Sequence, residues 1–352
     1  MQSILITGGA GYIGIHTALT FLENGFNIII IDSFSNSSRK SIDRLLEIAS
    51  SSNKFTSNQI NFFEGDVRDI NFLRNVFRQS LISGNYIDAV VHFAGLKSVP
   101  ESISLPELYW DVNVYGTLQL LKVMSENNCT NLVFSSSATV YSPKEESPLY
   151  ESYKVDPIDP YGKTKLAVEN LLRAFIKTQN LKWKIICLRY FNPIGAHYSG
   201  RIGESPKNVP NNLFPYMCEV AIGKRKLLKI YGNNWPTPDG TCIRDFIHIM
   251  DLVEGHLAAF KYLNEKDNDK YFQIINLGTG RGTSVLELME TFERVNELKL
   301  NYKFSERRLG DKAIVYSNCD LAKKILSWEA KKDISEMCKD GWNWQYNNPN
   351  GY

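Results

Sequence analysis

The sequence lacks the features that mark secreted, metal-binding and membrane-spanning chains. Its six cysteines form no Cys-x-x-Cys pair and no close cluster with histidine, which argues against a zinc site or a disulfide framework. No apolar run approaches the ~20 residues that a membrane-spanning helix needs. No basic segment opens the chain, and glycines appear already at Gly8, so a secretory signal peptide is not expected. We expect a cytoplasmic protein whose cysteines act as small core residues.

The chain also lacks an excess of charge of either sign. Across 352 residues the formal net charge is +2, and hydrophobic residues make up 43%. So weak a field gives no attraction to nucleic acid or to an anionic membrane, and neither is expected as a partner. The densest basic run, residues 223–229, is interrupted by two leucines, which favours a solvated surface. Length and composition are those of a globular protein with a large core.

Apolar runs alternate with helical patterns through the first half of the chain. Strands are expected over 3–7, 27–32, 60–66, 89–95, 131–137 and 184–192, and helices over 15–25, 116–128 and 163–180. Strands that are apolar on both faces and alternate with helices indicate a parallel sheet covered on both sides. The sequence therefore predicts an α/β fold with a doubly wound parallel sheet of the Rossmann type.

The pattern changes near residue 193. Proline and glycine become frequent over residues 192–215, and the regular alternation weakens. We predict a nucleotide-binding domain over residues 1–193 and a second, smaller α/β substrate domain over residues 194–352. Some segments of the second domain are expected to fold back on the first.

A glycine-rich turn joins the first expected strand to the first expected helix. In the stretch TGGAGYIG, Gly8, Gly11 and Gly14 let the pyrophosphate of a dinucleotide approach the backbone at the positive end of the helix. Asp32 ends the next strand, where a carboxylate accepts hydrogen bonds from the adenosine ribose and repels a 2′-phosphate, which favours NAD over NADP. Asp66 follows the third strand, where a side chain can meet the adenine edge; a plain turn aspartate is the alternative there.

A tyrosine and a lysine stand one helical turn apart in the stretch DPYGKTK. Asp159 is the expected N-cap and Pro160 the first helical residue, so Tyr161 and Lys165 share one helix face. A phenol with a pKa near ~10 acts as a base at pH 7 only if that pKa falls to near ~7, and a nearby ammonium group lowers it. Serine residues end the strand over 131–137 at the sheet edge where ligands bind, and their hydroxyls can donate to a substrate oxygen or relay its proton. Together with the glycine turn, these residues predict a catalytic Tyr/Lys pair rather than an ordinary helix start.

These motifs together resemble the extended short-chain dehydrogenase/reductase superfamily, and within it the UDP-galactose 4-epimerases. The resemblance covers nearly the full length and rests on TGGAGYIG, HFAGLKSV (92–99), SSSATVY (135–141), YGKTK (161–165), LRYFNPIGAH (188–197), PNNLFPY (210–216), DGTCIRDFIHIMDL (239–252), RRLGD (307–311) and WNWQYNNPNGY (342–352). It implies an enzyme that inverts C4 of UDP-galactose or UDP-glucose through a 4-keto sugar, with tightly bound NAD. It also implies a homodimer.

The resemblance assigns roles to individual positions of this sequence. Besides the three glycines, it implies cofactor contacts from Tyr12, Ile13, Asp32, Ser33, Phe34, Ser35, Asn36, Ser37, Asp66, Val67, Phe93, Ala94, Gly95, Lys97, Asn113 and Phe191, and from the catalytic Ser137, Tyr161 and Lys165. The implied substrate contacts are Lys97, Ser137, Tyr161, Asn192, Asn212, Leu213, Arg244, Arg308, Asp311 and Val315. The chemistry agrees, because arginines match diphosphate oxygens bidentately and an aspartate accepts from a ribose hydroxyl.

Two positions depart from the pattern that this family shows. Val112 precedes Asn113 where some relatives carry a second asparagine, which puts one cofactor contact in doubt. Val315 stands four residues after Asp311, where some relatives carry a bulky tyrosine, and a small residue there leaves room for a 2-acetamido group. The resemblance thus predicts that UDP-N-acetylglucosamine and UDP-N-acetylgalactosamine are also interconverted.

Three other functions stay open on this fold. A nucleotide-sugar 4,6-dehydratase shares the glycine turn and the Tyr/Lys pair, but relatives of that kind typically carry Asp-Glu where this chain has Ala138 and Thr139. A simple NAD(P)H reductase would release its cofactor at each turnover. A non-catalytic NAD-sensing binding protein could lose Tyr161 or Lys165 without harm, and both are present.

Overall fold

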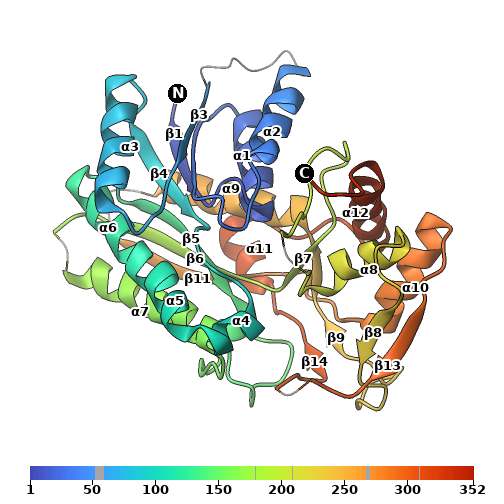
Figure 1. The fold of residues 1–352 in the computed structure, drawn as a ribbon. Coiled ribbons are helices and arrows are strands. Elements are labelled where there is room, and N and C mark those ends of the chain that lie inside the picture. The colour runs from blue at the N-terminus through green and yellow to red at the C-terminus, as the bar shows by residue number, and fades with distance from the viewer. Residues whose placement is uncertain (52–58, 179, 208, 267–269, 309) are drawn as a thin grey trace.

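Seven parallel strands form one large sheet with helices on both faces (Figure 1). The computed structural model describes residues 1–51, 59–178, 180–207, 209–266, 270–308 and 310–352. The strands are β1 (Ser3–Thr7), β2 (Asn27–Asp32), β3 (Ile60–Glu64), β4 (Ile87–His92), β5 (Asn131–Ser137), β6 (Lys184–Tyr190) and β11 (Tyr271–Leu277). Their spatial order is β11-β6-β5-β4-β1-β2-β3, so the direction of winding reverses between β1 and β4. This confirms the predicted doubly wound α/β fold.

The strands are apolar on both faces because helices cover both faces. One layer holds α1 (Tyr12–Glu23), α2 (Lys40–Ser51) and α9 (Ile249–Glu265); the other holds α3 (Ile70–Ile82), α6 (Gly116–Glu126) and α7 (Pro160–Thr178). Within β1, Ile4 and Ile6 belong to the core of the first layer, whereas Leu5 belongs to the core of the second. Successive side chains of the strand thus point to opposite faces of the sheet. This alternation fixes the register of the strand, because a shift by one residue would move each side chain into the opposite core.

Two helices begin earlier than the apolar pattern indicates. Helix α1 starts at Tyr12 rather than residue 15, because the glycine turn leads directly into it. Helix α7 starts at Pro160 rather than residue 163, which makes Asp159 the residue before the helix. The expected end of α7 at residues 179 and 180 falls partly outside the described residues, since residue 179 is not among them.

The chain after residue 193 builds smaller sheets and helices beside the large sheet. Its short strands are β7 (Asn192–Ile194), β8 (Leu228–Tyr231), β9 (Ile243–Arg244), β10 (Phe246–His248), β12 (Thr283–Ser284), β13 (Tyr302–Ser305) and β14 (Ile314–Val315). Its helices besides α9 are α8 (Leu213–Ala221), α10 (Val285–Asn296), α11 (Asp320–Leu326) and α12 (Ile334–Asn347). Strand β9 lies between β12 and β14, β7 pairs with β10, and β8 pairs with β13.

Two segments of this later part belong to the large sheet and its layers. Strand β11 pairs with β6 along its whole length, from Tyr271 opposite Lys184 to Leu277 opposite Tyr190. Helix α9 packs against α1 in the same layer. Four short elements border the site described below. They are α4 (Val99–Ser104), α5 (Pro106–Tyr109), the π-helix η2 (Trp110–Tyr115) and the 3-10 turn η3 (Ala138–Val140). Within the described residues, no helix combines the length and apolarity that crossing a membrane requires.

Candidate active site

Contacts with Asp159, Ser102 and Thr139 fix the first turn of α7 in place. Asp159 Oδ1 accepts a hydrogen bond from the Gly162 N–H at 2.8 Å, so Asp159 is the N-cap that the sequence predicts. The Tyr161 N–H donates to Ser102 Oγ on α4 at 3.2 Å. A Cβ on Gly162 would lie 2.8 Å from the Thr139 carbonyl oxygen, so only glycine lets the helix approach the end of β5 this closely. The start of α7 is therefore held against the carboxyl edge of the sheet.

Tyr161 and Lys165 are buried on the face of α7 that meets β5. Lys165 Nζ donates to the Ser135 carbonyl oxygen at 2.8 Å. The same nitrogen lies 5.9 Å from the centroid of the Tyr161 ring and 5.0 Å from that of Phe134. The predicted pair is thus one spatial unit, with the ammonium group held beside the tyrosine ring.

Burial dominates the electrostatics of this pair. It raises the pKa of Tyr161 to about 12, against a hydrogen bond with the Ser137 hydroxyl that lowers it. Burial lowers the pKa of Lys165 to about 8, so most molecules carry the ammonium charge at pH 7. We expected surroundings that lower the tyrosine pKa; in the protein alone the net effect is the opposite, because burial outweighs the hydrogen bond with Ser137.

Ser137 stands at the last position of β5, facing the tyrosine. Its Oγ accepts hydrogen bonds from the Thr139 N–H at 3.2 Å and from the Thr139 hydroxyl at 2.9 Å. Because both of these bonds are accepted, the Ser137 proton is free to be donated toward Tyr161 or a substrate oxygen.

The glycine turn lies at the start of α1, as predicted. Gly8 has a φ of 64°, and a Cβ on Gly14 would lie 2.3 Å from the Gly8 carbonyl oxygen, so the turn closes only with glycine. Gly11 has no side chain with which to cap the first N–H groups of α1. These groups and the helix dipole provide an anion site suited to a pyrophosphate.

Asp32 extends from the end of β2 to the same turn. Its carboxylate accepts from the Ala10 N–H at 2.9 Å, from the Phe34 N–H at 2.9 Å and from Ser37 Oγ at 2.7 Å. Ser37 is buried beside it, whereas Ser33, Ser35 and Asn36 are exposed on the loop that follows β2. A carboxylate beside a phosphate-binding turn fits the adenosine ribose of NAD.

The loop after β3 places Asp66 in an ion-pair network. Arg68 pairs with Asp66 and with Asp111, both at 2.6 Å, and it lowers the pKa of Asp66. The neighbouring Val67 is buried, and a Cβ on Gly116 would lie 2.9 Å from its methyl group. An adenine edge that meets Asp66 would therefore meet a carboxylate already bound to Arg68.

Asn113 connects the loop after β4 to α7. Its Oδ1 accepts from the Leu96 N–H at 2.7 Å, and its Nδ2 donates to Thr164 Oγ1 at 3.0 Å. It lies in η2, and π-helical turns are frequent at functional sites. A Cβ on Gly95 would lie 3.0 Å from Asn113 Oδ1 and 3.9 Å from Lys165 Nζ, so this loop passes close to Lys165.

Lys97 and Asn212 meet at one carboxylate. Lys97 Nζ and Asn212 Nδ2 both approach Glu204 Oε1, at 3.0 Å and 3.1 Å. Tyr12, at the start of α1 beside Ile13, donates its hydroxyl to the Gly195 carbonyl oxygen at 2.7 Å. These contacts therefore connect segments that precede residue 193 with segments that follow it, next to the glycine turn.

Two further residues assigned to the substrate, Arg244 and Val315, lie on the small sheet of β9 and β14. Arg244 Nη2 and Asp311 Oδ1 form an ion pair at 3.1 Å. Val315 pairs with Arg244 in the β14–β9 register, and it packs against the apolar cluster that contains Phe191 and Val140. This chain of contacts leads from the ion pair to the end of β5.

The remaining assigned residues have surroundings of their own. The Arg308 guanidinium lies 3.9 Å from the Tyr231 ring centroid. Asn192 is exposed on β7, Leu213 begins α8, and Phe93 packs its ring 5.0 Å from that of His256. Ala94 is half-buried beside Phe93.

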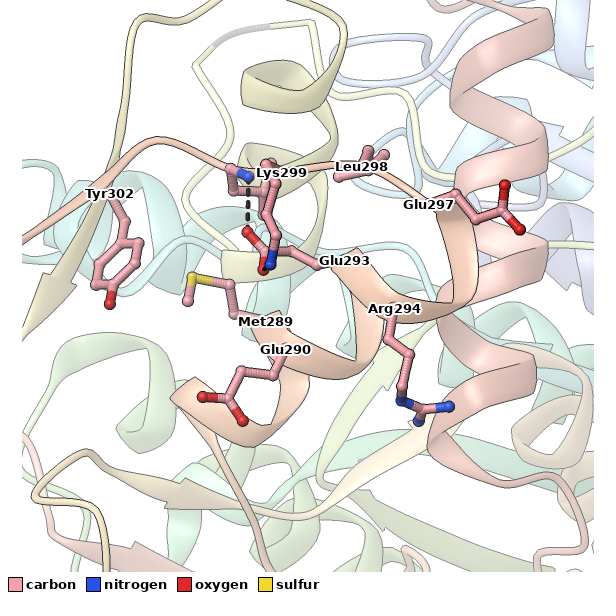
Figure 2. A pocket seen from close by; sticks show the side chains of 9 residues that line it. Met289, Glu290, Glu293, Arg294, Glu297, Leu298, Lys299 and Tyr302 are labelled. Atoms are coloured by element: carbon pink, nitrogen blue, oxygen red, sulfur yellow. Dashed lines mark hydrogen bonds and ion pairs between the residues drawn. The ribbon is translucent and has the colours of Figure 1, made fainter.

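A surface pocket of about 780 Å³ lies elsewhere, at the end of α10 (Figure 2). The residues that line it are Met289, Glu290, Glu293, Arg294, Glu297, Leu298, Lys299, Leu300 and Tyr302. None of the residues that the sequence assigns to cofactor or substrate is among them. Within the described residues, no cluster of histidine, cysteine or carboxylate side chains could hold a metal ion.

Comparison with known proteins gives the family. A family model described as GDP-mannose 4,6 dehydratase matches residues 5–341. A bifunctional UDP-glucose 4-epimerase and UDP-xylose 4-epimerase of Pisum sativum is 47% identical over 351 residues, which is 100% of this chain and 97% of the relative. The chain belongs to the UDP-glucose 4-epimerases. It is an NAD-dependent enzyme of the extended short-chain dehydrogenase/reductase superfamily.

Solved structures of epimerases share the whole fold. A UDP-glucose 4-epimerase of Stenotrophomonas maltophila, with bound NAD and formylated UDP-arabinopyranose, has a TM-score of 0.92 at 38% identity and covers 99% of both chains. One of Bifidobacterium longum, in complex with NAD⁺ and UDP, has a TM-score of 0.90 at 41% identity and covers 100% of both chains. The dehydratase description of the matching model reflects the larger superfamily. This epimerase has Ala138 and Thr139, not carboxylates, after Ser137.

Several residues of the epimerase site were not predicted. Glu169 follows Lys165 by one more helical turn, and the four-residue spacing could have indicated that it faces the same way. Glu204 and Tyr231 lie in segments without a regular pattern, so no sequence signal pointed to them. His92 and His248 are both buried.

Proposed function

We propose that the protein interconverts UDP-galactose and UDP-glucose with Tyr161 as the acid/base, Lys165 as its charge partner and Ser137 as the proton relay. The observation that carries the proposal is the unit that these three side chains form at the end of β5. NAD, held by the glycine turn and Asp32, would accept the hydride from C4, and the positive charge of its nicotinamide ring would favour the Tyr161 phenolate. Tyr161 takes the proton of the sugar 4-hydroxyl as C4 loses its hydride and a 4-keto sugar forms. After the sugar has turned, the hydride would return to the opposite face of C4, and Tyr161 returns the proton to the C4 oxygen.

Residues of the later part of the chain supply the contacts with the nucleotide. Arg244, Arg308 and Asn212 suit the diphosphate, and Asp311 suits a ribose hydroxyl. The hexose must turn about its phosphate bonds between the two half-reactions, so affinity has to lie on the UDP part. The ion pair of Arg244 with Asp311 supports this proposal, because it keeps both side chains on one edge of the β9–β14 pair.

The first experiment is turnover without added cofactor. UDP-galactose is added to purified protein, and UDP-glucose formation is followed by chromatography. We expect conversion toward equilibrium with no net change in NADH absorbance, since NAD stays bound. Product that requires stoichiometric NAD(P)H would identify a reductase, and loss of water from the sugar would identify a dehydratase.

We also propose that the acetamido sugars UDP-N-acetylglucosamine and UDP-N-acetylgalactosamine are substrates. Val315 supports this, because it is small and packs against the cluster of Val140, Tyr141, Leu149 and Phe191 that follows the end of β5. Val315→Tyr is expected to lower kcat/KM for the acetamido pair about tenfold or more while changing that for UDP-galactose less than about threefold. Absence of acetamido turnover in the unmodified protein, or its survival in Val315→Tyr, would contradict the proposal.

We further propose a cytoplasmic homodimer. All six cysteines are free thiols, which suits a reducing compartment. The dimer is supported by a row of exposed apolar side chains on α4, α5 and η2, at Ile103, Leu108, Trp110 and Tyr115. Apolar groups gathered on neighbouring helices gain free energy when a second copy covers them.

A further inference from the structure

Three acidic or basic groups lie on one face of α7 at intervals of four residues. Tyr161 and Lys165 occupy the first two positions, and Glu169 occupies the third. The Glu169 side chain is only 2% exposed. A carboxylate buried this deeply is costly unless partners satisfy it, so its contacts indicate what it does.

The Glu169 carboxylate is bound on both of its oxygens. Arg189 on β6 donates from Nε to Oε1 at 2.9 Å and from Nη2 to Oε2 at 2.7 Å. Ser136 on β5 donates its hydroxyl to Oε1 at 2.5 Å. The carboxylate therefore ties α7 to both neighbouring strands at their carboxyl ends.

Ser136 lies on β5 between Ser135 and Ser137, and both of these neighbours contact the Tyr161–Lys165 pair. The Ser135 carbonyl accepts from Lys165 Nζ, and the Ser137 hydroxyl bonds to Tyr161. A hydrogen bond at Ser136 fixes the backbone on which both depend. A shift of this strand end relative to α7 would misplace both contacts at once.

Glu169 also acts on the charge of Lys165. The titratable groups around this lysine are Tyr161 and Glu169 on α7 and His92 on β4, with Tyr190 on β6 facing Tyr161. Burial lowers the pKa of His92 to about 3 and raises that of Tyr190 well above its ordinary value, so both are neutral near pH 7. Glu169 raises the pKa of Lys165 and so favours the ammonium form.

We propose that Glu169, clamped by Arg189, is a positioning residue of the active site that holds the end of β5 and the charge of Lys165 in place for Tyr161. The inference rests on the proposed epimerase function. It assigns no contact with substrate or cofactor to Glu169, which acts through Ser136 and Lys165.

The test is Glu169→Gln, assayed beside the unmodified protein with UDP-galactose. We expect kcat to fall about tenfold or more, because hydrogen bonds to a charged group are lost, while KM changes less than about twofold. The alkaline limb of the kcat/KM profile should move to lower pH, since removing the carboxylate lowers the pKa of Lys165.

Two further variants separate positioning from stability. Glu293→Gln removes a mostly buried carboxylate that pairs with Lys299 at 2.7 Å in the pocket at the end of α10 (Figure 2), and it should leave kcat and the pH profile unchanged. Ser136→Ala keeps the Glu169–Arg189 pair and should lower kcat about threefold or more. If Glu169→Gln does not fold, Ser136→Ala by itself tests whether Glu169 positions the end of β5.

The outcomes of these assays distinguish failure of the proposed function from failure of the inference about Glu169. If the unmodified protein does not epimerise, the proposed function fails, and this inference with it. If it does epimerise but Ser136→Ala and folded Glu169→Gln keep its kcat and alkaline limb, the function stands and the inference is overturned. A fall in kcat that only matches the unfolded fraction seen by circular dichroism also overturns it.

Discussion

In the proposed mechanism Tyr161 is buried so that it meets the sugar away from water, yet burial opposes the phenolate that this proposed role requires. Its pKa is raised to about 12 by burial, and Ser137 only partly offsets this. Lys165 supplies a positive charge near the ring, although its own pKa is lowered to about 8 by the same burial. The acid/base residue therefore depends on positive charge in its surroundings.

Replacing Tyr161 by phenylalanine removes the acid/base group and keeps the ring. We expect kcat for UDP-galactose to fall about a thousandfold, the scale of general acid–base catalysis, with KM nearly unchanged. Steady-state assays check this, with Tyr86→Phe as the control because Tyr86 is 69% exposed on the surface. Retention of a tenth or more of the activity would place the base elsewhere.

The pH dependence of kcat/KM is expected to follow the ionisation of Lys165. Below a pKa of about 8 the lysine is charged, and above it the charge is lost. We expect kcat/KM for UDP-galactose to fall above about pH 8, with a slope near −1 on logarithmic axes. A profile that stays flat to pH 9.5 would contradict this assignment.

Most strands of the large sheet could be predicted, because each is a short apolar run followed by a helical pattern. β1, β2 and β5 have the predicted bounds, whereas β4 ends at His92, three residues before the apolar run does. The partner of β6 could not be predicted, because β11 lies some 80 residues further along and pairing at that distance leaves no local signal. Glu204 was missed for a similar reason, since only the fold brings Lys97 to it.

At the scale of the element, the glycine turn is the most constrained part of the cofactor site. Gly14→Ala would place a methyl group against the Gly8 carbonyl, a backbone atom that can move only by opening the turn. We expect NAD affinity to fall about tenfold or more, measured by calorimetry on protein stripped of cofactor. The control is Gly84→Ala, which strains a φ of 77° in open space and should lower thermal stability without changing NAD affinity.

At the scale of the whole molecule, the exposed row on α4, α5 and η2 predicts the assembly. Trp110 is 44% exposed, and Trp110→Glu would bury a charge in the proposed dimer interface. We expect the dimer dissociation constant to rise about 30-fold or more, followed by sedimentation velocity. Tyr346→Glu on α12 is the control, and a monomeric unmodified protein at micromolar concentration would contradict the proposal.

The pairing of β11 with β6 has a consequence for synthesis on the ribosome. When Tyr190 has left the exit tunnel, β6 has β5 on one side and an open edge on the other, because β11 is still to be made. At about 5 to 20 residues per second, the strand waits roughly 4 to 18 s for its second neighbour. Unpaired edges promote association between chains, so nascent chains of this enzyme are most exposed to aggregation in that interval.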